Sequence, residues 1–198
     1  MAIGWFQGRM EFGPRALGHR SIIADPRSEK MQKNLNLKVK FRESFRPFAP
    51  AVIEEDLNDW FDSETSNSYM LLVSNVKDSK LINNSVKSEG FDQLNDKRSE
   101  IPAVTHVDNS ARIQTVNEKS NKRFHELLKE FKKITNVPIL INTSFNIRGE
   151  PIVSSAEDAF RCFMGTNLDI LVCENYVILK KDNKSQKDVN YKDKFKLD

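Results

Sequence analysis

The interpretation of the chain starts from one stretch, residues 8–26, with the sequence GRMEFGPRALGHRSIIADP. Three glycines and three arginines fall within residues 8–20, and the central Gly-Pro pair predicts a turn. Glycine lets the backbone approach a ligand closely, and the arginine guanidinium offers a planar fork of donors that suits phosphate or carboxylate. The stretch therefore predicts a loop that holds a small anion. The alternative is a structural turn whose arginines are solvated or paired with Glu11 and Asp25.

The composition is typical of a soluble protein with one domain, or two very small ones. Of the 198 residues, 38% are hydrophobic and 30% are charged. The net charge of +3 is all carried by residues 180–198, which contain seven lysines and four aspartates, so we expect no nucleic-acid partner. No apolar run approaches the length of a membrane span, and no signal peptide is evident. We therefore expect no membrane partner and a cytoplasmic location.

The two cysteines do not predict a metal site. Cys162 and Cys173 lie in apolar patterns, and no close-spaced cluster of cysteine and histidine is present. We expect both to be buried thiols in a reducing cytosol, and no metal ligand in this chain.

Apolar periodicity predicts strands that alternate with helices, which is typical of an α/β domain. Strands are expected at residues 3–6, 48–53, 69–73, 102–107, 113–116, 139–141, 168–173 and 176–179, the last two as a hairpin. Helices are expected at residues 29–37, 56–61, 124–134 and 155–165. Asn117 or Ser120 should cap the third helix, and Ser155 with Asp158 should form a capping box on the fourth.

Three further expectations concern particular positions. Pro50 lacks a backbone donor, so the strand at 48–53 should lie at a sheet edge or be interrupted. His125 should be solvated on the polar face of its helix rather than catalytic. Residues 75–100 are polar and predict a long insertion or a mobile loop.

Two later stretches accompany the first, in the order 40–50, KFRESFRPFAP, and 142–152, NTSFNIRGEPI. Together the three stretches resemble the C-terminal domain of the O-carbamoyltransferases of the NodU/TobZ type. The resemblance covers about residues 3–180. It implies the YrdC-like fold, an α/β domain with a twisted mixed sheet, flanking helices and an open concave face for the ligand.

The resemblance and the composition together predict the domain organisation. Residues 1–180 should form a single carbamoyltransferase C-terminal domain, with the polar insertion or loop at about 75–100. Residues 181–198 should be a disordered tail, because alternating lysine and aspartate cannot bury enough apolar surface to fold.

The resemblance also implies a division of labour between two domains. The YrdC-like domain would convert carbamoyl phosphate and ATP, with magnesium, into carbamoyl adenylate, releasing phosphate and pyrophosphate. An N-terminal domain that holds a metal ion would then transfer the carbamoyl group to an acceptor hydroxyl. This sequence lacks that domain, so we expect the first half-reaction alone, with the partner domain supplied in cis or in trans. A separately encoded half-enzyme and an excised domain are both open, as are a homodimer and the identity of the acceptor.

Phosphate binding should depend on discrete side chains, because the chain has no G-x-x-x-x-G-K-[ST] loop. Arg15, Lys40 and Arg46 are expected to act in catalysis, the lysine as a compact charge and the arginines as bidentate clamps. Glu11 and Glu43 should orient the arginines. The expected binding residues are Arg15, Lys40, Arg46, Arg112, Asn142, Ser144 and Arg148, of which Asn142 and Ser144 should share one face of a strand.

Two other functions remain as alternatives. A threonylcarbamoyl-adenylate synthase that modifies tRNA shares the fold and the type of intermediate, and dependence on bicarbonate and threonine would distinguish it. A non-catalytic nucleotide-binding or docking subunit of a carbamoyltransferase would instead expose an apolar surface to its partner.

Overall fold

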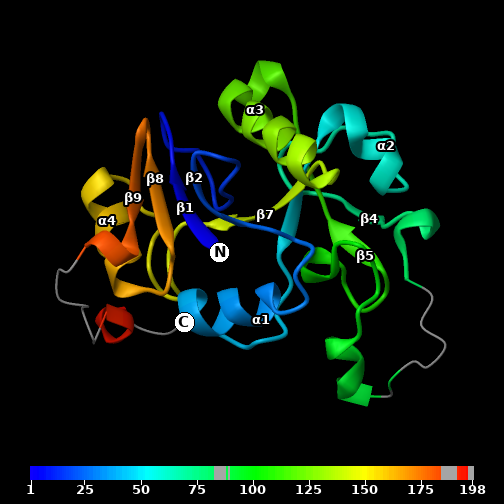
Figure 1. Cartoon of the computed structure of the whole chain (residues 1–198), viewed down its shortest axis with the longest axis horizontal. Coiled ribbons are helices and arrows are strands. Elements are labelled where there is room, and N and C mark those ends of the chain that lie inside the picture. Colours follow the sequence, from blue (N-terminus) through cyan, green and yellow to red (C-terminus); the bar gives the residue numbers. More distant parts are fainter. Residues whose placement is uncertain (83–87, 89, 184–190, 196–198) are drawn as a thin grey trace. The chain divides into compact units, whose positions relative to one another are not determined.

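The computed structural model describes residues 1–82, 88, 90–183 and 191–195, and Figure 1 shows the whole chain. The chain divides into two compact units. The first comprises Met1–Ala24, Lys33–Arg46 and Asn142–Asp198, and the second comprises Asp25–Gln32 and Pro47–Ile141. Helices alternate with strands, and both parallel and antiparallel pairs occur, which confirms the mixed α/β class. The likeness to the YrdC fold stays a prediction.

The first unit is built on strands in the order β7-β2-β1-β8-β9. β1 (Ala2–Phe6) pairs antiparallel with β2 (Arg20–Ala24) and parallel with β8 (Ile170–Cys173). β8 and β9 (Tyr176–Leu179) form the expected hairpin. Of β7 (Ile139–Ser144), the last three residues belong to the first unit and the first three to the second. In Figure 1 the blue start of the chain accordingly lies beside the orange strands β8 and β9.

Besides 3-10 turns at Lys180–Asp182 and Tyr191–Lys194, the described part of the first unit contains one α-helix and most of a second helical segment. α4 (Ala156–Gly165) begins at the predicted capping box, in which Ser155 Oγ accepts from Asp158 N at 3.1 Å and Asp158 Oδ2 accepts from Ser155 N at 3.0 Å. α1 (Met31–Leu35) continues as a π-helical turn (Asn36–Lys40), which ends where Phe41 adopts the left-handed conformation with φ of 51°. The wider turn places Val39 and Lys40 together in the interior.

The second unit has strands in the order β6-β3-β7, with a separate antiparallel pair of β4 (Val73–Asn75) and β5 (Ser110–Arg112). β3 (Ala49–Ile53) runs parallel to β6 (Gln114–Val116). Its helices are α2 (Leu57–Trp60) and α3 (Glu118–Thr135), with single 3-10 turns at Glu54–Asp56, Asp78–Lys80, Gly90–Asn95 and Pro102–Val104.

The expectation of an edge strand at Pro50 is wrong. β3 has a neighbour on each side, β6 and β7. Its register with β6 begins at Ala51, so the proline precedes the ladder on that side and its missing donor is not needed there.

The strand expected at 102–107 is absent, and the strand expected at 69–73 is displaced toward the C-terminus. Tyr69 and Leu71 are exposed, and the strand begins only at Val73. The buried Asn67 explains this, because its Oδ1 accepts from Leu71 N at 3.0 Å and its Nδ2 donates to the carbonyls of Leu72 and Ile113. These are bonds that a strand partner would otherwise supply. Residues 102–104 form a 3-10 turn instead, and the next strand, β5, begins only at Ser110.

The structure of α3 confirms one of the two predicted N-caps and shows that the prediction for His125 is wrong. Asn117 is the N-cap, since its Oδ1 accepts from Ser120 N at 2.9 Å. His125, expected in solvent, is buried, and its Nε2 lies 3.1 Å from each carboxylate oxygen of Glu55. Ile134, the last residue of the helix expected at 124–134, is 84% exposed. Helical periodicity could not show that a preceding turn would supply a partner for a buried histidine.

The two segments expected to lack order are described in part. Within the polar stretch, residues 83–87 and 89 lie outside the described residues, and its ends meet at a bridge between Leu81 and Ser99. Within the tail, residues 184–190 and 196–198 lie outside them, whereas Tyr191–Lys194 form a 3-10 turn. Tyr191 is only 4% exposed, which composition did not predict. In the part of the chain described, no helix is long and apolar enough to cross a membrane.

Gly4 in β1 should be intolerant of a side chain. A Cβ there would lie 2.6 Å from Phe145 Cζ and 2.8 Å from Cε1, and Phe145 is fully buried. We expect Gly4→Ala to lower the free energy of unfolding by about 1–3 kcal/mol, because the core would be overpacked. Urea denaturation measures this. Combining it with Phe145→Leu should cost less than the two single changes added together, and strict additivity would contradict the contact.

Candidate anion-binding site

The loop of the first motif is held from inside by Glu11. Its Oε1 accepts from the backbone N–H groups of Leu17 at 2.6 Å and His19 at 2.8 Å. Burial alone would raise the pKa of Glu11, but the hydrogen bonds from His19 and from these backbone groups lower it overall. Glu11 therefore orders the loop through its backbone, not by pairing with an arginine as expected from the sequence.

Arg20 closes the base of the same loop. Its guanidinium donates to the carbonyls of Gln7 at 2.8 Å and Gly8 at 2.9 Å and stacks over the Phe6 ring, 3.5 Å from the centroid. Arg15 lies on the exposed part of the loop. Its neighbour Ala16 is buried, and the Ala16 carbonyl accepts from Asn142 Nδ2 at 3.0 Å. Asn142 thus anchors the loop that carries Arg15.

Lys40 lies at the centre of the first unit's polar network. Its side chain is buried, and Nζ donates to Ser144 O at 2.8 Å, Asn146 O at 2.8 Å and Asn146 Oδ1 at 2.7 Å, with Ser144 Oγ at 3.3 Å. These acceptors use all three ammonium donors. Burial, reinforced by the nearby charge of Arg42, lowers the pKa of Lys40 to about 7. In this arrangement Lys40 holds the loop that follows β7.

That loop is further ordered by its own side chains. Ser144 Oγ donates to Asn146 Oδ1 at 2.7 Å, and Asn146 Nδ2 donates to Glu150 O at 2.6 Å. Glu150 Oε2 accepts from Ile147 N at 2.8 Å, and Arg148 N donates to Lys40 O at 3.2 Å. The second and third motifs are therefore joined through backbone and side chain together.

Three arginines from these two motifs gather around one carboxylate. Glu43 lies 3.7 Å from Arg148 Nη1 and 3.9 Å from Arg46 Nη1, distances typical of loose ion pairs. Arg42 Nε donates to Asn36 Oδ1 at 2.6 Å. Burial, and then repulsion from Arg46, lower the pKa of Arg42 to about 10. With Lys40, this cation cluster (Lys40, Arg42, Arg46 and Arg148) concentrates positive charge that an anion would relieve.

Of the seven residues predicted from the sequence, four lie in this network: Lys40, Arg46, Ser144 and Arg148. Asn142 supports the neighbouring loop, and Arg15 is exposed on it. Sequence reasoning missed Arg42, Asn36, Asn146 and Glu150. The spacing of four between Arg42 and Arg46 and the polar positions of the third motif were the available signals.

Arg112 belongs to the second unit, at the end of β5. Near it, Ser110 Oγ donates to Asp108 Oδ1 at 2.6 Å and lies 3.1 Å from His106 Nδ1. Burial lowers the pKa of His106, and the charge of Arg112 adds to this effect. A role for Arg112 in nucleotide binding stays a prediction.

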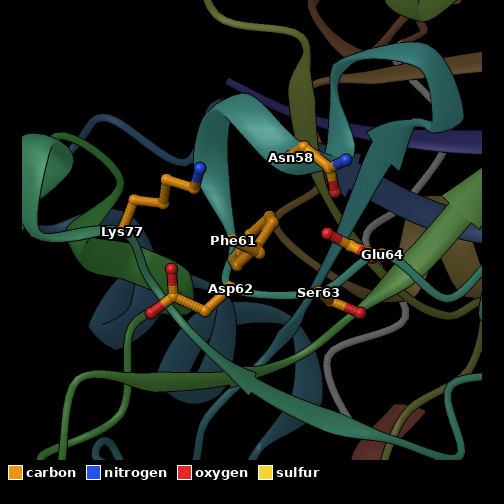
Figure 2. A pocket seen from close by; sticks show the side chains of 6 residues that line it. All are labelled: Asn58, Phe61, Asp62, Ser63, Glu64 and Lys77. Carbon is orange, nitrogen blue, oxygen red and sulfur yellow. The ribbon is translucent and has the colours of Figure 1, made fainter.

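The second unit also contains a shallow polar cavity of about 320 Å³. Figure 2 shows Lys77 and Asp62 on one side of the Phe61 ring, with Asn58 and Glu64 on the other. None of the seven predicted site residues lines this cavity. Among the described residues of the chain, no group of three or more histidine, cysteine, aspartate or glutamate side chains is arranged to hold a metal ion.

Comparison with known proteins identifies relatives along nearly the whole chain. Residues 1–180 match the family model described as the carbamoyltransferase C-terminus. An uncharacterised protein of Synechocystis sp. is 52% identical over 200 residues, which cover 99% of this chain and 32% of that protein. Nodulation protein NolNO of Sinorhizobium fredii is 47% identical over 182 residues, 90% of this chain and 24% of that protein.

A relative with a named enzymatic activity is also similar. The 3'-hydroxymethylcephem-O-carbamoyltransferase of Amycolatopsis lactamdurans is 38% identical over 156 residues, which cover 79% of this chain and 26% of that enzyme. The chain therefore spans about a quarter to a third of the length of these curated relatives.

The lowered pKa of Lys40 should be visible in the pH dependence of stability. Between about pH 7 and 10.5, the value for an unperturbed lysine, the unfolded chain binds a proton that the folded chain does not. Lys40 should therefore make the free energy of unfolding rise with pH in that window, by about 1.4 kcal/mol per pH unit at most. We expect Lys40→Met to remove this rise in urea denaturation at pH 6.5, 7.5 and 8.5.

Lys38→Met is the matched control, because Lys38 lies on the same π-helical turn with an exposed side chain. Its pH profile should run parallel to that of the parent protein. Parallel profiles for the parent and Lys40→Met would instead show that the pKa of Lys40 is the same in the folded and unfolded states.

Proposed function

Because the chain belongs to the carbamoyltransferase C-terminal family, we propose that it forms carbamoyl adenylate from carbamoyl phosphate and ATP. Phosphate and pyrophosphate can both leave only if water first splits carbamoyl phosphate into carbamate and phosphate. A carbamate oxygen then attacks the α-phosphorus of ATP, and the bond to pyrophosphate breaks. Each step develops or moves negative charge on phosphate oxygens, which a fixed set of cations stabilises.

The observation that carries this proposal is the crowding of cations in the first unit. Arg46 and Arg148 are only loosely paired with Glu43, and their side chains are 54% and 32% exposed. Repulsion from neighbouring cations contributes to the lowered pKa values of both Lys40 and Arg42. A bound phosphate would offset this repulsion, so the cluster is electrostatically prepared for an anion.

We assign different roles to the cations. Arg46 and Arg148 would bind phosphate oxygens directly, since a guanidinium can donate two parallel hydrogen bonds. Lys40 would position them, because its three donors already hold the loop after β7. Arg15 would reach the nucleotide from the exposed loop that Glu11 and Asn142 order. Ser144 and Asn142 would act through these loops.

Magnesium suits this scheme as an ion that arrives with the nucleotide. Protein sites for it usually supply one or two carboxylates, and substrate phosphates supply the rest. Bound magnesium would neutralise charge on the phosphates, and the chain's own cations would orient them.

Transfer to an acceptor hydroxyl would belong to a separate N-terminal carbamoyltransferase domain, supplied in cis or in trans. A second candidate function, a docking subunit, is favoured by a specific observation in the first unit. Met10, Phe12 and Phe45 are large apolar side chains with exposed fractions of 42%, 109% and 54%. They flank the arginines of the first two motifs, where a partner domain could cover them.

The exchange of labelled pyrophosphate into ATP, dependent on carbamoyl phosphate, tests the proposed reaction. Arg46→Ala and Arg148→Ala should each lower kcat/KM by about 10- to 100-fold, the effect of losing a hydrogen bond to a charged group. Arg161→Ala is the matched control, because Arg161 is exposed on α4 of the same unit and pairs with Asp158. Its exchange rate should equal that of the parent chain.

The other outcomes separate the alternatives. Exchange that requires bicarbonate and threonine would identify a threonylcarbamoyl-adenylate synthase. ATP binding without exchange, restored when the rest of a carbamoyltransferase is added, would identify a docking or nucleotide-binding subunit.

A further inference from the structure

The C-terminal segment Tyr191–Phe195 packs against the first unit beyond the residues that match the family model. Tyr191 is buried, and its ring lies so close to Gly165 of α4 that even a methyl group at Gly165 would collide with it. The Phe195 ring meets the Tyr191 ring edge-on, with centroids 5.5 Å apart. Lys194 Nζ lies 5.8 Å from the centroid of the same ring. The segment therefore has one buried anchor.

The anchor's hydroxyl binds the loop of the candidate site. Tyr191 Oη donates to Glu150 Oε1, while Glu150 Oε2 accepts from Ile147 N at 2.8 Å. Burial, and then interaction with Cys162 and Glu150, raise the pKa of Tyr191, so the hydroxyl stays a donor at neutral pH. Burial also raises the pKa of the Cys162 thiol, which interacts with the same two side chains.

From Glu150 the contacts continue into the cation cluster. The Glu150 carbonyl accepts from Asn146 Nδ2 at 2.6 Å, and Asn146 Oδ1 accepts from Lys40 Nζ at 2.7 Å. The Lys40 carbonyl in turn accepts from Arg148 N at 3.2 Å. The Glu150 carboxylate thus links Tyr191 to Ile147, and the Glu150 carbonyl links the same loop through Asn146 to Lys40.

We propose that Tyr191 is a positioning residue for the candidate site: residues 191–195 form a clasp that fixes the Glu150 carboxylate and thereby the loop 146–150 with Arg148. Its consequence for turnover rests on the proposed function, whereas the clasp itself does not. The clasp would present Arg148 to the phosphate group of carbamoyl phosphate or ATP. It adds a residue outside the three motifs to the determinants of phosphate binding.

Two measurements that need no turnover test the clasp. Cys162 is fully buried beside Tyr191, so in a Cys173→Ser background its labelling by a small thiol reagent should be slow. Tyr191→Ala should increase the labelling rate at least tenfold by removing the anchor. Tyr191→Phe keeps the ring, so labelling should stay slow, whereas hydrogen exchange of the Ile147 amide should accelerate about tenfold because Glu150 loses its partner.

Lys192→Ala is the matched control, since Lys192 is exposed on the same turn. It should leave both labelling and exchange unchanged. Labelling of Tyr191→Ala at the parent rate would overturn the clasp. An unchanged Ile147 exchange rate in Tyr191→Phe would overturn the positioning role.

Turnover provides the third test. If the parent chain catalyses pyrophosphate exchange, Tyr191→Phe should raise KM for carbamoyl phosphate or for ATP about tenfold with little change in kcat, and Lys192→Ala should change none of these. Unchanged KM values for both substrates would overturn the positioning role. If the parent chain shows no exchange, the proposed reaction fails by itself, and the labelling and hydrogen-exchange results still decide the inference.

Discussion

The buried ammonium of Lys40 is the interaction on which the candidate site depends. It joins a helical turn from one part of the first unit to the loop after β7, across 104 residues of sequence, through acceptors on Ser144 and Asn146. A charged group is costly to bury unless it is fully hydrogen-bonded. The loop therefore has little freedom to rearrange, because any movement would leave some of the ammonium's donors without acceptors.

A second layer of constraint comes from charge. Burying Lys40 near Arg42, with Arg46 and Arg148 close to the same carboxylate, collects cations in one region of the first unit. Such an arrangement opposes folding and favours an anionic ligand, a balance often found at functional sites. It also separates two roles that the motifs alone do not distinguish. The buried lysine orders the site, and the more exposed arginines are suited to contact the ligand.

In the first motif, too, the residues that order the loop differ from those that are exposed to a ligand. Its glycines and arginines suggest an anion-binding loop, but its most connected side chains are Glu11 and Arg20, which bond to the loop's own backbone. Arg15 is left exposed at its tip. The motif is thus a scaffold whose most connected polar residues are structural, and two of its arginines, Arg9 and Arg15, are exposed. The Tyr191 clasp would play the same kind of part for the loop of the third motif.

The sequence by itself determined the family, through three motifs in order, and the elements whose signals are local. These include β1, the terminal hairpin, the capping box of Ser155 and the first half of β7. What only the tertiary structure decided depends on partners distant in sequence. Asn67 replaces a strand partner at 71–72, and Glu55 allows His125 to be buried. Glu150 accepts the hydrogen bond of the buried Tyr191 hydroxyl. Periodicity and propensity describe one segment at a time, so they cannot show which distant group will satisfy a buried polar side chain.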